Sequence, residues 1–129
     1  MKKAILWIFA LLLITGLSYA KDYEVTKKVG PYQVMTSIDK NPPIAGKNNM
    51  SVKVQDAQGK AVTDAKVAID YVMPAMPGMP AMSYKANAAL KGDSYKAEIN
   101  FSNSGPWTVT IKISRAGKIE RMKFSVDVQ

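Results

Sequence analysis

The sequence predicts an all-β protein, an immunoglobulin-like antiparallel β-sandwich of about seven strands that follows an N-terminal signal peptide. Three observations lead to this prediction. Apolar and polar residues alternate with a period of two along most of the chain after residue 30, which is typical of strands with one buried face. Turn-forming Gly, Pro, Asn and Asp residues separate the alternating runs, and no run has the period of an amphipathic helix. Short strands with one apolar face bury that face when two sheets pack together.

The first twenty residues have the three parts of a secretory signal peptide. Lys2 and Lys3 precede an apolar run over residues 4–17, and small residues, Ser18 and Ala20, stand three and one positions before a cut after Ala20. The run of 14 residues is shorter than the roughly 20 that cross a bilayer. We therefore expect cleavage after Ala20 rather than an uncleaved membrane anchor, and an exported, periplasmic domain of residues 21–129.

Six strands are predicted from the alternation. They cover residues 32–39, 50–55, 67–73, 95–101, 107–114 and 119–128. Residues 22–28 either add an edge strand or form a loose arm. The hairpin formed by the last two runs is the most clearly indicated pairing, because its turn at residues 115–118 is short and both arms alternate. Trp107 lies on the apolar face of its run and is predicted to be a core residue rather than a cover over a bound ion.

The composition argues against an enzyme. The chain has no Cys and no His, so it lacks a thiolate nucleophile and the usual general base beside a nucleophilic Ser or Thr. It also has no glycine-rich phosphate loop and no calcium-loop spacing of acidic residues. We expect no small-molecule substrate.

Charge gives a weaker indication of partners. Without Lys2 and Lys3, 16 basic and 10 acidic residues leave the mature chain with a net charge of +6. The basic residues are scattered along the sequence, which predicts a solvated surface with at most weak attraction to an anionic envelope surface. Export makes nucleic acid an unexpected partner.

The segment from Met73 to Met82 is the one chemically distinctive feature. It has a Met at every third position and a Pro after each of the first three. Three prolines so close together exclude a ladder strand or a helix, because each removes a backbone donor, so the segment is predicted to be a loop. Core filling, the ordinary role of Met, suits Met50, Met122 and also Met73, which continues the apolar face of Tyr71.

The spacing of the other methionines favours a Cu(I) site. Thioether sulfur is a soft, neutral ligand that selects Cu(I). In a straight polyproline II rod, successive Met residues lie about 9 Å apart, whereas two ligands of one ion lie within about 4 to 5 Å of each other. Met76-Pro77-Gly78-Met79 has Pro and Gly where a type II turn requires them. This turn predicts Met76 and Met79 as the first two ligands of Cu(I) or Ag(I), with Met82 or Met73 as the third.

Two other roles for the segment stay open from the sequence. It can be a Met-rich docking surface for another protein, without metal, or a structural loop that plugs one end of the sandwich. The Cu(I) interpretation predicts a non-enzymatic periplasmic protein that hands the ion to a membrane-bound partner.

The chain resembles the YtkA-like family, which also includes FixH-like domains. The more specific resemblance lies in residues 73–79 and in Gly105-Pro106-Trp107-Thr108-Val109, and broader matches run from Asn41-Pro42-Pro43 to Phe124-Ser125-Val126-Asp127-Val128. The resemblance implies an exported immunoglobulin-like module. It also implies a partner in heavy-metal efflux or respiratory oxidase assembly, because relatives are encoded near such components or fused to them. Relatives commonly carry another Met where this chain has Asn103.

Overall fold

The computed structural model describes residues 22–129, and the predicted signal peptide, residues 1–20, lies outside the described residues. This part of the chain forms eight strands and no helix, so it contains no helix long and apolar enough to cross a membrane. The strands are β1 (Tyr23–Val29), β2 (Tyr32–Ile38), β3 (Gly46–Gln55), β4 (Lys66–Met73), β5 (Met82–Lys91), β6 (Ser94–Phe101), β7 (Gly105–Arg115) and β8 (Lys118–Val128).

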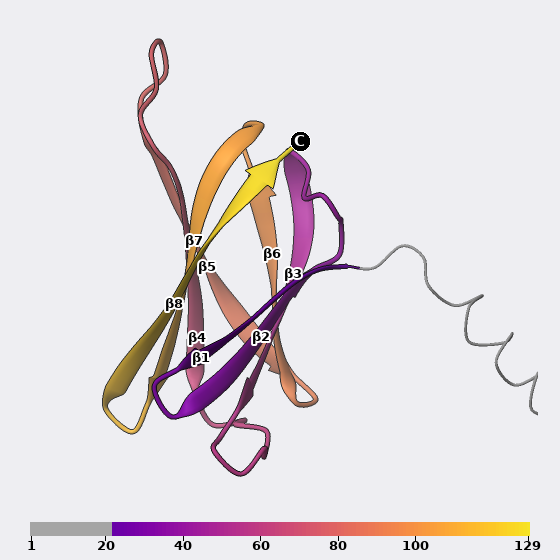
Figure 1. The fold of residues 1–129 in the computed structure, drawn as a ribbon, viewed down its shortest axis with the longest axis vertical. Helices are drawn as coiled ribbons and strands as arrows, with labels where there is room; N and C mark the ends of the chain where they lie inside the picture. Colours follow the sequence, from indigo (N-terminus) through magenta and orange to yellow (C-terminus); the bar gives the residue numbers. More distant parts are fainter. Residues whose placement is uncertain (1–21) are drawn as a thin grey trace, which may run out of the picture.

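All strand pairs are antiparallel, and the strand order is β1-β2-β3-β6-β5-β4-β7-β8 (Figure 1). Strand β5 joins two sheets, because Met82–Ala88 pairs with β4 whereas Ala89–Lys91 pairs with β6. The order β2-β3-β6-β5 beside β4-β7-β8 matches the strand arrangement of an immunoglobulin constant-type domain, with β1 added at an edge.

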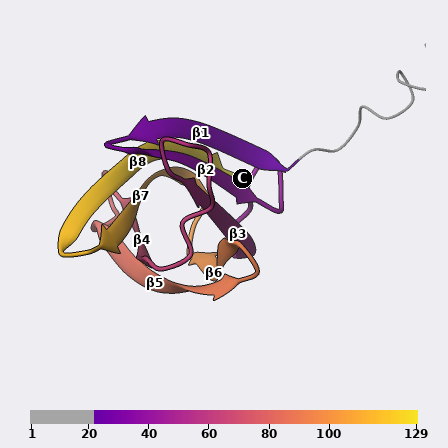
Figure 2. The same ribbon diagram turned by 90° about the horizontal axis from the view of Figure 1, so that it is seen from below.

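The two edge strands approach each other and almost close the sandwich. Tyr23 Oη donates a hydrogen bond to the Ser125 carbonyl at 3.4 Å, and Lys27 Nζ donates to the Lys123 carbonyl at 2.8 Å. Seen from below, the strands surround a central core, and β1 lies alongside β8 (Figure 2). Side chains of β1 thus satisfy backbone carbonyls of β8, the other edge strand. In an open sheet such carbonyls stay exposed.

The structure confirms the all-β antiparallel sandwich and corrects its details. There are eight strands rather than about seven: residues 23–29 are an edge strand, and β5 lies where the alternation predicts none. Strand β3 also begins at Gly46, four residues earlier than expected. The hairpin of β7 and β8 is confirmed, and its two central residues, Ala116 (φ 52°) and Gly117 (φ 78°), have the positive φ angles of a type I′ turn.

The core fills the space between the sheets with side chains from every strand except β5 and with Val62 from the β3–β4 connection. The buried apolar side chains of the described residues run from Val29 to Val128, so every strand in this range except β5 contributes to the core. Trp107 is 1% exposed and is confirmed as a core residue, as are Met50, Met73 and Met122.

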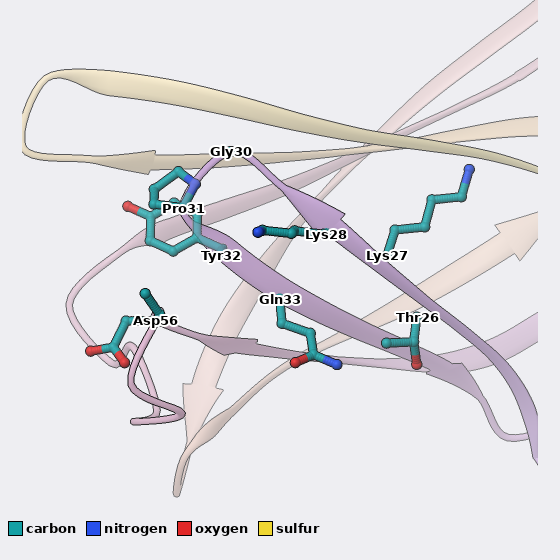
Figure 3. Close-up of a pocket in the computed structure, with 9 residues that line it drawn as sticks. Thr26, Lys27, Lys28, Gly30, Pro31, Tyr32, Gln33 and Asp56 are labelled. Atoms are coloured by element: carbon teal, nitrogen blue, oxygen red, sulfur yellow. The ribbon is translucent and has the colours of Figure 1, made fainter.

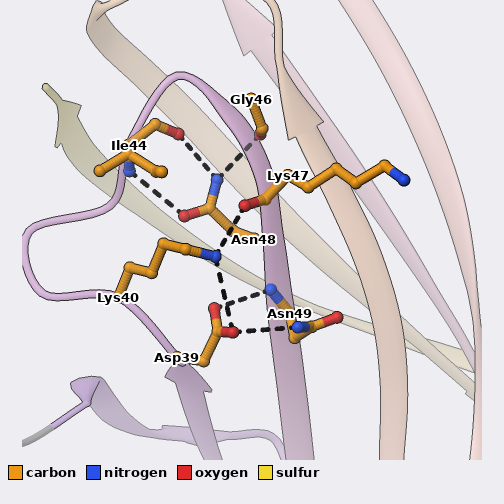
Figure 4. Close-up of polar contacts among 7 residues, drawn as sticks. All are labelled: Asp39, Lys40, Ile44, Gly46, Lys47, Asn48 and Asn49. Carbon is orange, nitrogen blue, oxygen red and sulfur yellow. Dashed lines mark hydrogen bonds and ion pairs between the residues drawn. The ribbon is translucent and has the colours of Figure 1, made fainter.

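Polar contacts fix the β2–β3 connection at the end of the sandwich where the chain terminates (Figure 4). The Asn48 side chain is fully buried, and it accepts a hydrogen bond from Ile44 N and donates to the carbonyls of Ile44 and Gly46. Asp39 accepts hydrogen bonds from Asn49 N at 2.8 Å and Asn49 Nδ2 at 2.9 Å. These bonds satisfy the polar groups of a segment that lacks the alternation of a strand.

Candidate functional site

Residues 73–82, the Met–Pro hairpin, extend the β4–β5 pair beyond the end of the sandwich (Figure 1). Met73 and Met82 form the last regular pair of the two strands. Beyond them, Met76 and Met79 form an isolated bridge in which each N–H donates to the carbonyl of the other, at 3.0 and 2.8 Å. The regular ladder stops between these two pairs, where the prolines at positions 74 and 80 have no N–H to donate.

The tip of the hairpin is the predicted type II turn. Gly78 has φ 81°, which is the conformation that the third residue of such a turn requires and that a residue with a side chain avoids. Residues paired across an antiparallel ladder project to the same side, with Cα atoms about 5.5 Å apart when they exchange both hydrogen bonds. The structure therefore brings the side chains of Met76 and Met79 to one side of the hairpin, and both pack, half-buried, against the core.

Met73 and Met76 both approach Gly105, the first residue of β7. A Cβ atom built on Gly105 would lie 2.6 Å from Met73 Cε and 4.0 Å from Met76 Cε. Gly105 also has φ 127°. The missing side chain at this position thus leaves room for the Met73 methyl group, and the Met76 methyl group lies at the border of the same space.

Met82 faces a different set of groups. Its Sδ atom accepts hydrogen bonds from Ser102 Oγ and Asn103 Nδ2, each at 3.2 Å. Asn103 is also held through its carbonyl, which accepts a hydrogen bond from Trp107 Nε1 at 2.9 Å. The β6–β7 connection therefore covers the Met82 sulfur with two hydrogen-bond donors.

A cluster of four aromatic rings supports the base of the hairpin. Tyr71 stacks on Tyr84 with centroids 5.5 Å apart, and its ring also contacts Phe101 and Trp107. Trp107 lies 5.3 Å from Phe101 and 6.0 Å from Tyr84. These contacts hold the end of β4 and the start of β5 against the rest of the sandwich, so the methionines project from a rigid base.

The donor set at this end of the molecule is soft and uncharged. Within residues 22–129 no group of three or more Asp or Glu side chains is arranged to hold a metal ion, and the chain has no Cys or His. Four thioethers in one hairpin can hold a soft monovalent ion and are poor ligands for hard divalent cations. The sequence identified the four methionines, and it drew attention to Asn103 only through the family resemblance. It gave no sign that Ser102 and Gly105 contact the methionines, because these contacts depend on how the β6–β7 connection folds.

A separate pocket of about 590 Å³ lies at the opposite end, beside the β1–β2 turn (Figure 3). Lys27, Lys28, Tyr32 and Asp56 are among the residues that line it. Its carboxylate, Asp56, accepts hydrogen bonds from the backbone N–H groups of residues 58 and 60. The pocket offers no soft ligand, so its chemistry differs from that of the Met–Pro hairpin.

The fold and the hairpin define a class of protein: an immunoglobulin-like β-sandwich that presents thioether groups at one end. The chain matches the model of the YtkA-like family over residues 26–112 and belongs to that family. Its fold is similar to the crystal structure of the PmoD soluble domain from Methylocystis sp. ATCC 49242 (Rockwell), with a TM-score of 0.54 and 13% sequence identity over 81% of this chain and 96% of that one. A comparison with curated protein sequences finds no match.

Proposed function

We propose that this protein is an exported, non-enzymatic carrier of Cu(I) or Ag(I), which it binds through Met76, Met79 and one neighbouring methionine. One observation carries the proposal: Met76 and Met79 form a hydrogen-bonded pair across a two-residue turn. The turn supports their role as ligands because it places two sulfur-bearing side chains on one side of a short, proline-restricted hairpin.

The geometry suits a two-sulfur ligand pair. Paired Cα atoms about 5.5 Å apart allow flexible Met side chains to bring their sulfur atoms within about 4 to 5 Å, the separation set by metal–sulfur bonds near 2.3 Å. The turn is ordered by its own hydrogen bonds before the ion binds, which lowers the entropy lost on binding. Thioethers also stay unprotonated at every physiological pH, so binding by these ligands is independent of pH.

Met73 is the better placed third ligand. Its terminal methyl group and that of Met76 both approach Gly105, whereas the Met82 sulfur already accepts three hydrogen bonds, the third from Tyr84 Oη at 4.0 Å. Ligation by Met82 requires these donors to give up their bonds. Met82 therefore serves as an alternative ligand once the β6–β7 connection moves.

The expected partner is a membrane protein of metal efflux or respiratory oxidase assembly. Half-buried Met76 and Met79 lie on a projecting hairpin, where a second set of soft ligands can approach the ion. Weak neutral ligands favour transfer over storage, because they release the ion to a site with more or stronger donors.

The test is an anaerobic competition for Cu(I) between the mature protein, residues 21–129, and a chromophoric chelator. The Met76→Leu/Met79→Leu variant keeps side-chain volume and apolar character, and we expect it to lose at least about tenfold in affinity, or about 1.4 kcal/mol. Met35→Leu, which removes an exposed thioether on β2, is the matched control and should retain Cu(I) as the unmodified protein does. Equal retention by all three proteins would rule out the hairpin site.

A second candidate function is a metal-free docking hairpin. The projection of the hairpin beyond the sandwich favours it, as do the exposed apolar residues Ala75, Pro77 and Pro80. This function predicts that Met76→Leu/Met79→Leu retains binding of a membrane partner in a pull-down, whereas Met79→Asp loses it. The Cu(I) function also allows the Leu variant to bind the partner. It differs in predicting that this variant transfers no ion.

A further inference from the structure

The basic residues that are scattered in the sequence gather on one face of the structure. The pairing register places Lys85 of β5 and Lys123 of β8 in one row across the sheet and Lys112 of β7 and Arg121 of β8 in the next row. Lys66 of β4 follows in the row after that. These five side chains, which we call the basic face, all lie on the outer side of the sheet formed by β5, β4, β7 and β8, because the residues that alternate with them are directed to the core.

Two acidic residues, Asp70 and Asp127, lie on this side of the sheet and balance only part of its charge. Asp70 lies in the row of Lys85 and Lys123, and it forms an ion pair with Lys112 at 3.2 Å. The face therefore holds four other cations, which are exposed and form no salt bridge within residues 22–129.

The opposite sheet has a different charge pattern. There, Lys47 pairs with Glu98 and Lys53 pairs with Asp93, both at 3.9 Å. Two cations on that side are thus paired with acids, whereas the exposed Lys96 forms no salt bridge with any described residue. The five cations of the basic face outnumber its acidic residues and produce a local positive field there.

Two exposed aliphatic side chains border the basic face. Leu90, 43% exposed, and Ile119, 52% exposed, line one groove of about 530 Å³ together with Lys66, Lys112 and Arg121. Exposed aliphatic groups beside cations are the combination with which peripheral proteins bind a membrane, because the cations attract anionic headgroups while the aliphatic groups enter the headgroup boundary.

From this arrangement we propose that the basic face docks the domain on an anionic phospholipid surface. The cations extend over four strands, about 14 Å across at the usual strand spacing, and Lys85 and Lys123 lie outside the groove that the other three line. An array of anionic headgroups neutralises charges spread in this way. The charge complementarity favours a lipid surface over an acidic peptide, because the two exposed aliphatic side chains also gain by leaving water.

Docking on this face affects the position of the Met–Pro hairpin. The hairpin continues β4 and β5, which are two strands of the basic sheet, so a domain that lies on the membrane by this face keeps the hairpin close to the membrane surface. The docking inference rests on the charge pattern and the two exposed aliphatic side chains, and it stands independently of Cu(I) binding.

The test is sedimentation of the mature domain, residues 21–129, with lipid vesicles. We expect it to bind vesicles of phosphatidylglycerol and phosphatidylcholine, to release them as salt rises, and not to bind pure phosphatidylcholine. The variant Lys66→Gln/Lys85→Gln/Arg121→Gln/Lys123→Gln should lose at least about tenfold in affinity. The matched control, Lys47→Gln/Lys53→Gln/Lys60→Gln/Lys96→Gln, removes the same charge elsewhere and should lose no more than about threefold.

All eight positions lie outside the buried core, and circular dichroism verifies that both variants fold. Equal losses in the two variants would show that net charge alone matters, and this result would overturn the proposal. Binding to polyglutamate without binding to anionic vesicles would overturn it too, in favour of an acidic protein partner.

Discussion

Asn103 is the residue that most directly limits the sulfur groups available in the hairpin. Its side-chain amide donates to Met82 Sδ at 3.2 Å, while its backbone carbonyl is held by Trp107. The side chain can therefore be exchanged without disturbing the backbone contact. The sequence alone drew attention to this position only through the family resemblance, and the structure gives the physical reason for its importance.

A methionine at position 103 should strengthen Cu(I) binding. Asn103→Met removes one donor from the Met82 sulfur and adds a second thioether beside it, so we expect Cu(I) affinity to rise by about tenfold in the chelator competition. Asn103→Leu is the control, because it removes the same donor without adding a sulfur. An equal gain in both variants would assign the effect to the lost hydrogen bond, and no gain in either would contradict a site that includes Met82.

At the scale of elements, the start of β7 depends on Gly105. We expect Gly105→Ala to destabilise the domain by about 1–3 kcal/mol, because φ 127° is unfavourable for a residue with a side chain. The new methyl group would also displace the Met73 methyl from its position 2.6 Å away. Urea unfolding measures the first effect and Cu(I) competition the second. A variant as stable as the unmodified domain would show that β7 can begin without this backbone conformation.

The link between β2 and β3 should depend on pH. Hydrogen bonds from the Asn49 backbone and then from its side chain, assisted by Lys40, hold the pKa of the Asp39 carboxyl below its ordinary value. Because the folded pKa is the lower one, this link stabilises the fold at neutral pH, and the contribution disappears as the pH falls below about 4 and through the folded pKa.

Urea unfolding of the unmodified domain and of Asp39→Asn between pH 7 and pH 2.5 checks this dependence. The unmodified domain should be more stable at pH 7, and the difference between the two proteins should shrink as Asp39 is protonated. A difference that stays constant over this range would mean that the carboxylate contributes nothing to the link.

A strand could be predicted from the sequence when apolar and polar residues alternate clearly along it. The β7–β8 hairpin was predicted because large apolar residues occupy its inner positions, whereas β5 was missed because its inner positions hold half-buried or exposed residues such as Ala86 and Ala88. Strand β3 begins early because a buried, fully hydrogen-bonded Asn48 takes an inner position that an apolar residue normally fills. The basic face was not predicted either, because only the register brings its side chains together.

At the scale of the whole molecule, the hairpin is separable from the fold. Met73 and Met82 are already paired at the end of the regular ladder, so replacing residues 74–81 by Asn-Gly should close a two-residue hairpin. We expect the shortened domain to fold and to lose no more than about 2 kcal/mol of stability, from the half-buried Met76 and Met79 side chains. Urea unfolding measures this loss, and failure to fold would favour a structural plug at this end of the sandwich.

The central claim is that the sulfur atoms of the Met–Pro hairpin bind Cu(I). X-ray absorption at the copper edge tests it most directly, on the Cu(I)-loaded mature protein kept free of oxygen. The account predicts a shell of two or three sulfur atoms near about 2.3 Å, which disappears in the Met76→Leu/Met79→Leu variant. A shell of nitrogen or oxygen atoms, or an unchanged sulfur shell in that variant, would contradict it.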